Sequence, residues 1–257
     1  MKYVEYSVLD RMASITLNRP EKRNALSHEL VAELREAFSR AEQDHTVKVI
    51  ILKANGEAFS SGADLEYLQQ MQQFSYEQNF NDSNHLKELF LQIYSLKKVV
   101  IAQIQGHAIA GGCGLATVCD FSFAAPEAKF GYTEVKIGFV PAMVMVFLIR
   151  KIGESRARGL LLSGSLIGAD QAKKIGLINE IVSKEELEEE VIHFASQLVV
   201  TNSADSMRVT KQMMAQVQSL PLEDALTFAA EMNAKVRESP DCKRGVSAFV
   251  NKEKISW

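Results

Sequence analysis

Apolar and polar residues alternate near the start of the chain. Ala13, Ile15 and Leu17 lie two residues apart, which is the spacing that places side chains on one face of a β-strand. This strand is expected to end at the turn that contains Pro20, because proline cannot donate a hydrogen bond to a neighbouring strand. Residues 3–9 are expected to pair with it as a hairpin at the edge of a sheet.

The next segments repeat one order: a buried strand, a loop of small residues and the start of a helix. A first helix is expected from Ser27, which can cap it. The runs 47–52 and 99–104 have the length and apolar character of buried strands. The first run leads to the small-residue loop 59–65 and the second to the glycine pair 111–112, and a helix is expected after each loop.

Two further segments have alternative interpretations. Residues 66–85 are rich in Gln and Asn with a few aromatic residues, which favours a solvated helical excursion over a mobile flap above a pocket. The apolar run 143–149 is interpreted as core. A helix of that composition can also lie beneath an acyl pocket.

The chain changes from mixed α/β to helical near residue 185. Residues 183–186 read Ser-Lys-Glu-Glu and match a capping box, and two more helices are expected from about Ser203 and near Pro221. No low-complexity linker or tandem repeat divides the sequence. We expect an α/β core over 1–184 and a helical region over 185–257 that packs on the core or on another subunit.

The composition supports a large globular core and excludes several classes of function. The chain has 257 residues, of which 47% are hydrophobic, and a net charge of −3, so it has no basic surplus for nucleic acid. No apolar run is long enough for a bilayer, and a cytoplasmic protein without membrane partners is expected. Cys113, Cys119 and Cys242 show neither metal-binding spacing nor a disulfide framework, so no metal is expected.

The stretch from Ile104 to Glu134 holds the best candidate for an active site. Gly111 and Gly112 follow a strand and open a helix, whose first N–H groups lack internal partners and carry a partial positive charge. Such a helix start can hold an oxygen on which negative charge develops, and glycines let a ligand approach the backbone. Glycine pairs serve tight helix packing more often, so the pair alone leaves both interpretations open.

Five motifs, in the same order along the chain, resemble the crotonase (enoyl-CoA hydratase/isomerase) superfamily. They are LNRPEKRNAL at 17–26, AFSSGADL at 58–65, IAGGCGLATVCD at 109–120, FGYTEVKIGFVPA at 130–142 and GVSAFVNKEK at 245–254. The resemblance implies an α/β spiral of repeated ββα units and a C-terminal helical region that builds a homotrimer, often paired into a hexamer. It also implies an acyl-coenzyme A thioester as substrate, with no cofactor beyond the coenzyme A of that thioester.

The resemblance further implies roles for individual residues. In the family, two backbone N–H groups polarise the thioester carbonyl and stabilise an enolate-like oxyanion, and the matching positions are Ala63 and Gly111. Glu134 matches an acid/base residue, and its apolar neighbours are expected to raise its pKa. Acyl-CoA contacts are expected from Arg23, Ala25, Ala63, Asp64, Leu65, Gly111, Gly112 and Tyr132, and from Phe249 and Lys252 of a neighbouring subunit.

Several of these residues have a second interpretation. Tyr132 can donate to a substrate carboxylate or pack in the core, and Phe249 and Lys252 can belong to a buried tail with a solvated lysine. His107 and Asp120 are interpreted as structural residues.

Gly114 determines which reaction is expected. The best-known hydratases of the family carry two glutamates, and this chain has Gly114 in place of the first and Glu134 in place of the second. One glutamate is what the Δ3,Δ2-enoyl-CoA isomerases use. The segments 111–115, 133–134, 137–142 and 150–151 resemble methylglutaconyl-CoA hydratases and related dehydratases of branched thioesters, which act in fatty acid or branched-chain amino acid breakdown. We therefore expect reversible hydration of a 2-enoyl-CoA, branched ones included, with an isomerase as the alternative and a non-catalytic acyl-CoA-binding subunit as the second alternative.

Overall fold

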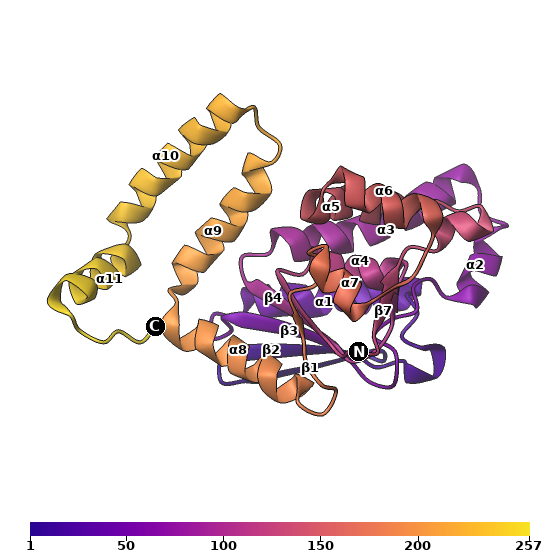
Figure 1. Ribbon diagram of the computed structural model, residues 1–257, viewed down its shortest axis with the longest axis horizontal. Helices are drawn as coiled ribbons and strands as arrows, with labels where there is room; N and C mark the ends of the chain where they lie inside the picture. Colours follow the sequence, from indigo (N-terminus) through magenta and orange to yellow (C-terminus); the bar gives the residue numbers. More distant parts are fainter.

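A six-stranded sheet forms the centre of the molecule. The computed structural model describes residues 1–257, with the exception of the Leu65 side chain. The strands of the sheet, in spatial order, are β1 (Val4–Leu9), β2 (Met12–Leu17), β3 (Val49–Ala54), β4 (Val99–Ile104), β6 (Phe121–Ala124) and β9 (Glu180–Ile181). β1 pairs antiparallel with β2, and all other neighbours in the sheet are parallel (Figure 1). The expected edge hairpin is confirmed.

A second, three-stranded sheet lies beside the first. Its strands are β5 (Ala108–Ile109), β7 (Lys129–Gly131) and β8 (Ile167–Gly168). β5 and β7 run parallel, so the residues that follow them leave the sheet at the same edge. This short pairing later places two parts of the candidate site side by side.

Helices cover both faces of the main sheet. The helices up to residue 201 are α1 (His28–Gln43), α2 (Leu65–Met71), α3 (Tyr76–Ser95), α4 (Gly111–Val118), α5 (Ala142–Ile152), α6 (Glu154–Ser163), α7 (Ala169–Lys174) and α8 (Leu187–Thr201), with 3-10 helices η1 (Pro20–Lys22) and η2 (Glu134–Ile137). The larger hydrophobic core lies between the sheet and helices α1 and α3 to α7, and the smaller one lies under α8. Among the described residues, no helix has the length and apolar character needed to cross a bilayer.

The two buried strands read as continuous apolar runs because both of their faces are covered. In β3, Ile50 and Leu52 enter the larger core, whereas Val49 and Ile51 enter the smaller one. Parallel strands between two helical layers have no solvent face to carry polar residues.

Capping explains where several helices begin. The Ser27 hydroxyl accepts from the Leu30 amide at 3.3 Å at the start of α1, as expected. The polar segment 66–85 is helical in α2 and α3, and Ser75 and Gln78 form a capping box for α3. The predicted capping box at 183–186 is wrong, because those residues form a turn and α8 begins only at Leu187.

Three further helices form a C-terminal arm that extends away from the sheet (Figure 1). They are α9 (Ala204–Val217), α10 (Leu222–Glu238) and α11 (Pro240–Asn251), whereas the sequence analysis predicts two. α11 has its own start signal, since Ser239 caps it and Pro240 occupies its first turn. The chain end returns to the core, where the Trp257 amide donates to the Val200 carbonyl at 3.1 Å. The division of the chain at residue 185 stays a prediction.

Buried lysines close the carboxyl ends of helices. The Lys48 amine donates to the carbonyls of Val199 and Asn202 at the end of α8, and Lys151 donates to Thr117 and Cys119 at the end of α4. A cation at this position satisfies carbonyls that lack helical partners and interacts favourably with the helix dipole. Lys48 is only 4% exposed, and burial, with Arg11 nearby, lowers its pKa to about 8.

The depressed pKa of Lys48 predicts a pH-dependent contribution to stability. Between pH 8 and the unfolded-state pKa of about 10.4, the unfolded chain binds more protons than the folded chain, so the contribution of Lys48 to the free energy of unfolding rises with pH. We expect the advantage in Tm of wild type over Lys48→Met to widen by a few degrees between pH 7.5 and pH 10. Thermal unfolding followed by circular dichroism measures it, and a constant difference would contradict the assignment.

Candidate active site

Two loops from distant parts of the sequence meet at one edge of the main sheet. They follow the parallel neighbours β3 and β4, so they leave the sheet on the same side. Ser60 donates its amide to the His107 carbonyl at 3.2 Å, and the Ile109 amide donates to the Ser60 carbonyl at 3.0 Å. This bridge places the loop that carries Ala63 against the loop that leads to Gly111.

Glycines permit this contact. A Cβ atom at Gly62 would lie 2.7 Å from the Ala110 Cβ and 3.5 Å from the Gly111 nitrogen, and Gly62 has a φ of +89° that favours glycine. A Cβ atom at Gly112 would lie 2.6 Å from the Ser60 Cβ. The two loops therefore meet backbone to backbone, with no room for a side chain between them.

Each loop has one backbone N–H that makes no hydrogen bond within the helix or bridge to which it belongs. Gly111 is the first residue of α4, so its N–H has no partner within the helix. On the other loop, the bridge to Leu26 uses the amide of Leu26, which donates to Gly62, and the amide of Asp64, which donates to Leu26. In a parallel bridge of this kind the N–H of Ala63 itself points away from the partner strand.

Ala110, the residue before this helix start, adopts an unfavourable backbone conformation. Its φ is +50° and its ψ is −122°, a combination that L-residues rarely adopt and that costs about 1–3 kcal/mol. Its amide is held by the Gly131 carbonyl at 2.8 Å. The surrounding structure thus stabilises an abrupt turn from β5 into α4, and this turn sets the direction of the Gly111 N–H.

Glu134 reaches the same edge from β7. In the parallel pair β5–β7 of the small sheet, Ile109 pairs with Gly131. Gly111 follows two residues after Ile109, and Glu134 follows three residues after Gly131. The strand pair therefore brings Glu134 and the start of α4 to the same side of the small sheet.

The Glu134 carboxyl group lies in a largely desolvated position. Its Oε2 atom is buried and has no hydrogen-bond partner among the described residues. Burial raises its pKa above the usual value, and a hydrogen bond from its own backbone N–H only partly opposes this. A carboxylate in such a place is a better base than an exposed one, because its pKa lies closer to neutral pH.

The position of Gly114 is closed by apolar side chains. A Cβ atom there would lie 3.0 Å from the Phe90 ring and closer still to a methyl group of Val144. Phe90 lies on α3 and Val144 on α5, and both are buried. A carboxylate at position 114 is therefore absent from the sequence and also sterically excluded by the packing.

Tyr132 and Asp64 do not present their polar groups to a ligand. Tyr132 has no exposed surface, and its hydroxyl shares a 2.7 Å hydrogen bond with Thr117, so the core interpretation holds and contact with a substrate carboxylate does not. Asp64 is 4% exposed, and its carboxylate accepts from Arg19 at 2.6 Å and from the Glu66 amide at 2.9 Å. A contact of Asp64 with acyl-CoA stays a prediction.

The other predicted contacts fall into two groups. Arg23 and Ala25 lie beside the Ala63 loop, where the Ser61 amide donates to the Arg23 carbonyl at 3.0 Å. Phe249 and Lys252 end α11, in the arm, and Phe249 is 85% exposed, so it does not belong to a buried tail of its own chain. Gly112 lies in the first turn of α4, and the predicted contact of the Leu65 side chain lies outside the described residues.

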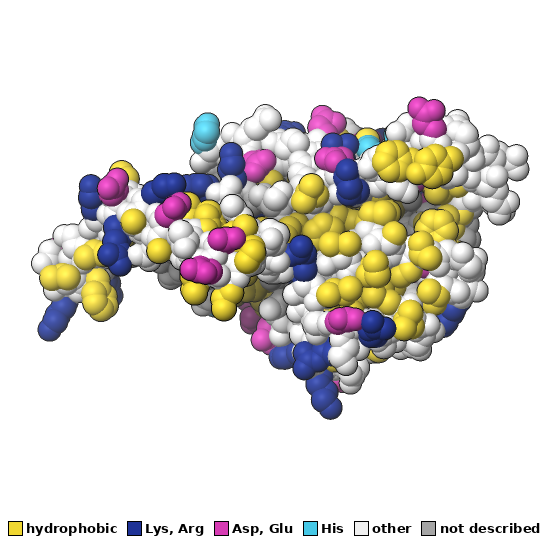
Figure 2. All heavy atoms as spheres, turned by 90° about the horizontal axis from the view of Figure 1, so that it is seen from above, with side chains coloured by type: hydrophobic (Ala, Val, Ile, Leu, Met, Phe, Trp, Pro, Cys, Tyr) yellow, Lys and Arg dark blue, Asp and Glu magenta, His cyan; other side chains and the backbone are white. Residues whose placement is uncertain are grey.

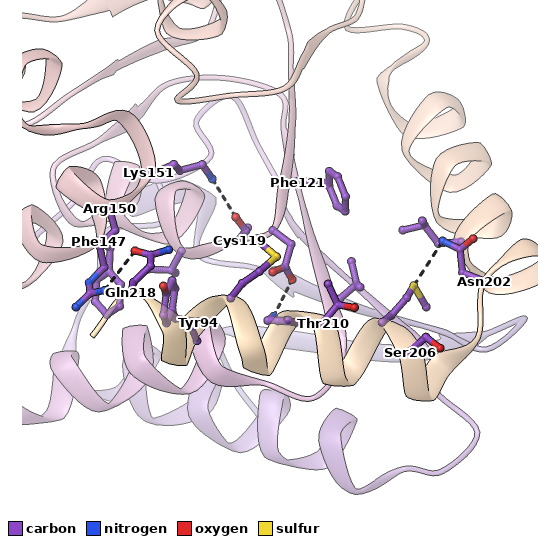
Figure 3. A pocket seen from close by; sticks show the side chains of 18 of the residues that line it. Tyr94, Cys119, Phe121, Phe147, Arg150, Lys151, Asn202, Ser206, Thr210 and Gln218 are labelled. Atoms are coloured by element: carbon purple, nitrogen blue, oxygen red, sulfur yellow. Dashed lines mark hydrogen bonds and ion pairs between the residues drawn. The ribbon is translucent and has the colours of Figure 1, made fainter. Parts of the chain in front are cut away.

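A cavity of about 790 Å³ lies elsewhere. It separates α9 from the carboxyl end of α4 and from α5 (Figure 3). Two contacts cross it, from Lys211 to Asp120 at 2.7 Å and from Arg150 to Gln218 at 3.3 Å. This cavity lies between the arm and the core and is not the candidate site. Within the described part of the chain, no cluster of His, Cys, Asp and Glu could hold a metal ion.

Known proteins resemble this chain over nearly its whole length. The family model described as enoyl-CoA hydratase/isomerase matches residues 9–257. The chain belongs to the enoyl-CoA hydratase/isomerase family.

A Thermus thermophilus protein, whose name is a provisional assignment as an enoyl-CoA hydratase, is 42% identical over 94% of this chain and 95% of its own length. Crotonyl-CoA hydratase of Syntrophomonas wolfei is 31% identical over 96% and 95% of the two chains. The crystal structure of an enoyl-CoA hydratase from Mycobacterium smegmatis superimposes with a TM-score of 0.93 at 30% identity, over 99% and 98% of the chains. The crotonase fold is confirmed.

Sequence reasoning missed the residues that support the site of this enoyl-CoA hydratase/isomerase family member. Arg19 pairs with Asp64, and the buried Asn24 side chain donates to the carbonyls of Asn55 and Ala58 at 2.8 and 2.9 Å. The available signal was an arginine and an aspartate in two separate motifs, but nothing in the sequence shows that they meet.

The glycine contact gives a testable prediction. In Gly112→Ala the new methyl group would press on the backbone of Ser60, so we expect a loss of about 1–3 kcal/mol in the free energy of unfolding. Gly159→Ala is a matched control in α6, where a Cβ meets nothing within 4 Å, and it should stabilise the protein by about 0.5–1 kcal/mol. Urea unfolding of both variants measures the difference, and equal effects would contradict the close contact.

Proposed function

We propose that the protein adds water reversibly to the double bond of a 2-enoyl-CoA thioester. The observation that carries this proposal is a buried carboxylate oxygen of Glu134, which has no hydrogen-bond partner among the described residues and belongs to a residue on the same side of the small sheet as Gly111. The family and the names of the relatives favour the same reaction. Ala63 supplies the second N–H group from the facing loop.

In the proposed reaction the thioester oxygen accepts hydrogen bonds from the amides of Ala63 and Gly111. Polarisation of the carbonyl makes C3 of the substrate electrophilic. Glu134 removes a proton from water as the oxygen of that water bonds to C3. The electron pair of the double bond moves through the carbonyl onto the thioester oxygen, which gives an enolate. The protonated Glu134 then gives its proton to C2, which restores the carbonyl and the carboxylate. Backbone donors need no reorganisation as the charge appears, and one such donor is worth about 3–4 kcal/mol.

An isomerase is the alternative, and the packing at Gly114 favours considering it. Phe90 and Val144 exclude a second carboxylate, and one base is enough to move a proton between C4 and C2 of a 3-enoyl-CoA. A non-catalytic acyl-CoA-binding subunit is a weaker alternative, since binding alone gives no reason to bury an unpartnered carboxylate oxygen. The acyl group of the substrate is proposed to include branched chains such as methylglutaconyl, on the sequence pattern alone.

Exposed apolar side chains support assembly with further copies of this chain. Figure 2 shows a broad hydrophobic area on the face toward which α5 and α6 lie in Figure 1. Ile137 and Val140, at the start of this region, are 70% and 64% exposed, and Phe249 and Val250 of α11 are 85% and 71% exposed. Apolar surface on this scale marks an interaction site. We propose a homotrimer or a pair of trimers, with Phe249 and Lys252 of one subunit at the coenzyme A of another.

The role of Glu134 is tested by Glu134→Gln. The amide keeps the shape of the side chain but cannot take a proton, so we expect kcat for hydration of crotonyl-CoA to fall by about 10²–10⁴-fold with little change in KM. Loss of absorbance of the conjugated thioester measures the rate. Methylglutaconyl-CoA and a 3-enoyl-CoA are assayed in parallel. Conversion of the 3-enoyl-CoA without hydration of any 2-enoyl-CoA would favour the isomerase, and retained activity in the variant would exclude Glu134 as the base.

The pKa of Glu134 predicts the acid side of the pH profile. The base works when it is deprotonated, so kcat/KM should fall as the pH drops through the raised pKa, at a higher pH than the value of 4.5 for an ordinary glutamate. Initial rates from pH 4 to pH 9 in constant ionic strength give this midpoint. A midpoint at or below 4.5 would contradict the burial of the charged group.

Burial of this charge also predicts that the inactive variant is more stable. A raised pKa means that the folded state binds more protons than the unfolded state between the two pKa values, so stability falls as pH rises through that window. We therefore expect Glu134→Gln to raise Tm by roughly 2 °C at pH 7 and by much less at pH 4. Differential scanning calorimetry at the two pH values checks the sign, and a destabilised variant at pH 7 would contradict it.

A further inference from the structure

The structure contains a second set of residues that belongs to the candidate site without facing it. We propose that Arg19 and Asp64 form a positioning pair that fixes the direction of the Ala63 N–H. The inference rests on the proposed function, because it assigns a purpose to the rigidity of one proposed oxyanion donor. Both residues act through the backbone and neither is expected to touch the reacting atoms.

Asp64 is held at every polar atom that the structure describes. One carboxylate oxygen accepts from Arg19 at 2.6 Å, and the other accepts from the amides of Glu66 and Tyr67 at 2.9 and 3.2 Å. Its own amide donates to the Leu26 carbonyl at 3.3 Å. Asp64 directly follows Ala63, so these contacts fix the peptide chain on the carboxyl side of the donor.

Arg19 also contacts the segment on the other side of the Leu26–Ala63 bridge. The guanidinium nitrogen that contacts Asp64 also donates to the Ala25 carbonyl at 3.4 Å, one residue before Leu26, the bridge partner of Ala63. The guanidinium lies over the Tyr3 ring with its central carbon 5.2 Å from the ring centre. Arg19 therefore holds the segment that contains Ala63 and the segment that contains its bridge partner Leu26 at a fixed separation.

The pair is largely shielded from solvent. The side chains of Arg19 and Asp64 are 12% and 5% exposed. Although burial alone would raise the pKa of Asp64, the Tyr67 amide and Arg19 hold it below the usual value, so the carboxylate stays charged at neutral pH. A charged, shielded pair with several hydrogen bonds is stiffer than an exposed one, and removing one partner leaves the other uncompensated.

A neighbouring ion pair serves as a matched control. Lys22 contacts Glu66 and links the same two segments, η1 and the first turn of α2. The side chains of Lys22 and Glu66 are 41% and 68% exposed, and exposed ion pairs of this kind contribute little to stability. Comparison of the two pairs separates a role in positioning from a general link between η1 and α2.

The experiment uses Asp64→Asn, Arg19→Met and Lys22→Met in the full-length protein. Asp64→Asn is the decisive variant, because its amide oxygen can still accept from Glu66 and Tyr67 while the ionic contact with Arg19 is lost. For hydration of crotonyl-CoA we expect kcat to fall about 10- to 100-fold in Asp64→Asn and Arg19→Met with KM changed less than about threefold, because a small displacement of a donor mainly affects the transition state. Lys22→Met should keep wild-type kcat.

A spectroscopic measurement distinguishes positioning from a loss of stability. The C=O stretching frequency of bound butyryl-CoA, a saturated thioester that does not react, reports how strongly the N–H groups polarise the carbonyl. We expect this frequency to move toward its value in solution in Asp64→Asn and to stay at the wild-type value in Lys22→Met. Thermal unfolding is recorded for each variant so that the spectra are taken well below its Tm.

The outcomes separate the two proposals. An active wild type with an unchanged carbonyl frequency and a kcat within twofold in Asp64→Asn would overturn the positioning pair and leave the proposed function standing. A wild type that binds butyryl-CoA with a shifted carbonyl but hydrates no 2-enoyl-CoA would overturn the proposed function, and the frequency in Asp64→Asn would still test the pair. If Arg19→Met does not fold, Arg19→Lys with Asp64→Asn decides, since the lysine keeps the charge and loses the contact geometry.

Discussion

The candidate site depends on one steric constraint, the direct contact between the backbones of two loops. Gly62 and Gly112 leave no room for a Cβ atom between the loop after β3 and the start of α4. Around this contact the chain uses Ser60 as a central connection: its hydroxyl donates to the Asn24 carbonyl at 2.8 Å and accepts from the Gly62 amide at 3.3 Å. The proposed donors on Ala63 and Gly111 are therefore set by main-chain packing, whereas Glu134 is delivered separately by the small sheet.

The sequence predicts the parts of the fold whose conformation depends on neighbouring residues in the chain. The spacing of Ala13, Ile15 and Leu17 records one face of β2, and Ser27 records the cap of α1. The capping box at 183–186 failed because its Ser and Glu side chains bond to each other at 2.6 Å within a turn, a choice that the same four letters allow. Helix α11 was not predicted, although Ser239 caps it and Pro240 occupies its first turn.

The site shows a different limit. The motifs predict Ala63, Gly111 and Glu134 because local sequence carries them, but the contacts of Arg19 with Asp64 join positions that are 45 residues apart. Tyr132 illustrates the converse, since its motif left both a pocket contact and a core position open, whereas its contact with Thr117 of α4 puts it in the core. Both the contact of Arg19 with Asp64 and the burial of Tyr132 depend on packing between elements, which no single segment of the sequence predicts.

Glu134 as a lone base has a stereochemical consequence. In the proposed hydration, one carboxylate takes the proton from water and returns a proton to the substrate, so the oxygen and the hydrogen reach the double bond from the same direction. The planar enoyl group presents only one of its two faces to that carboxylate while its carbonyl oxygen is held by the amides of Ala63 and Gly111. The product would be a single enantiomer formed by syn addition, and the handedness of its new alcohol would follow from the turn at Ala110 that aims one of those amides.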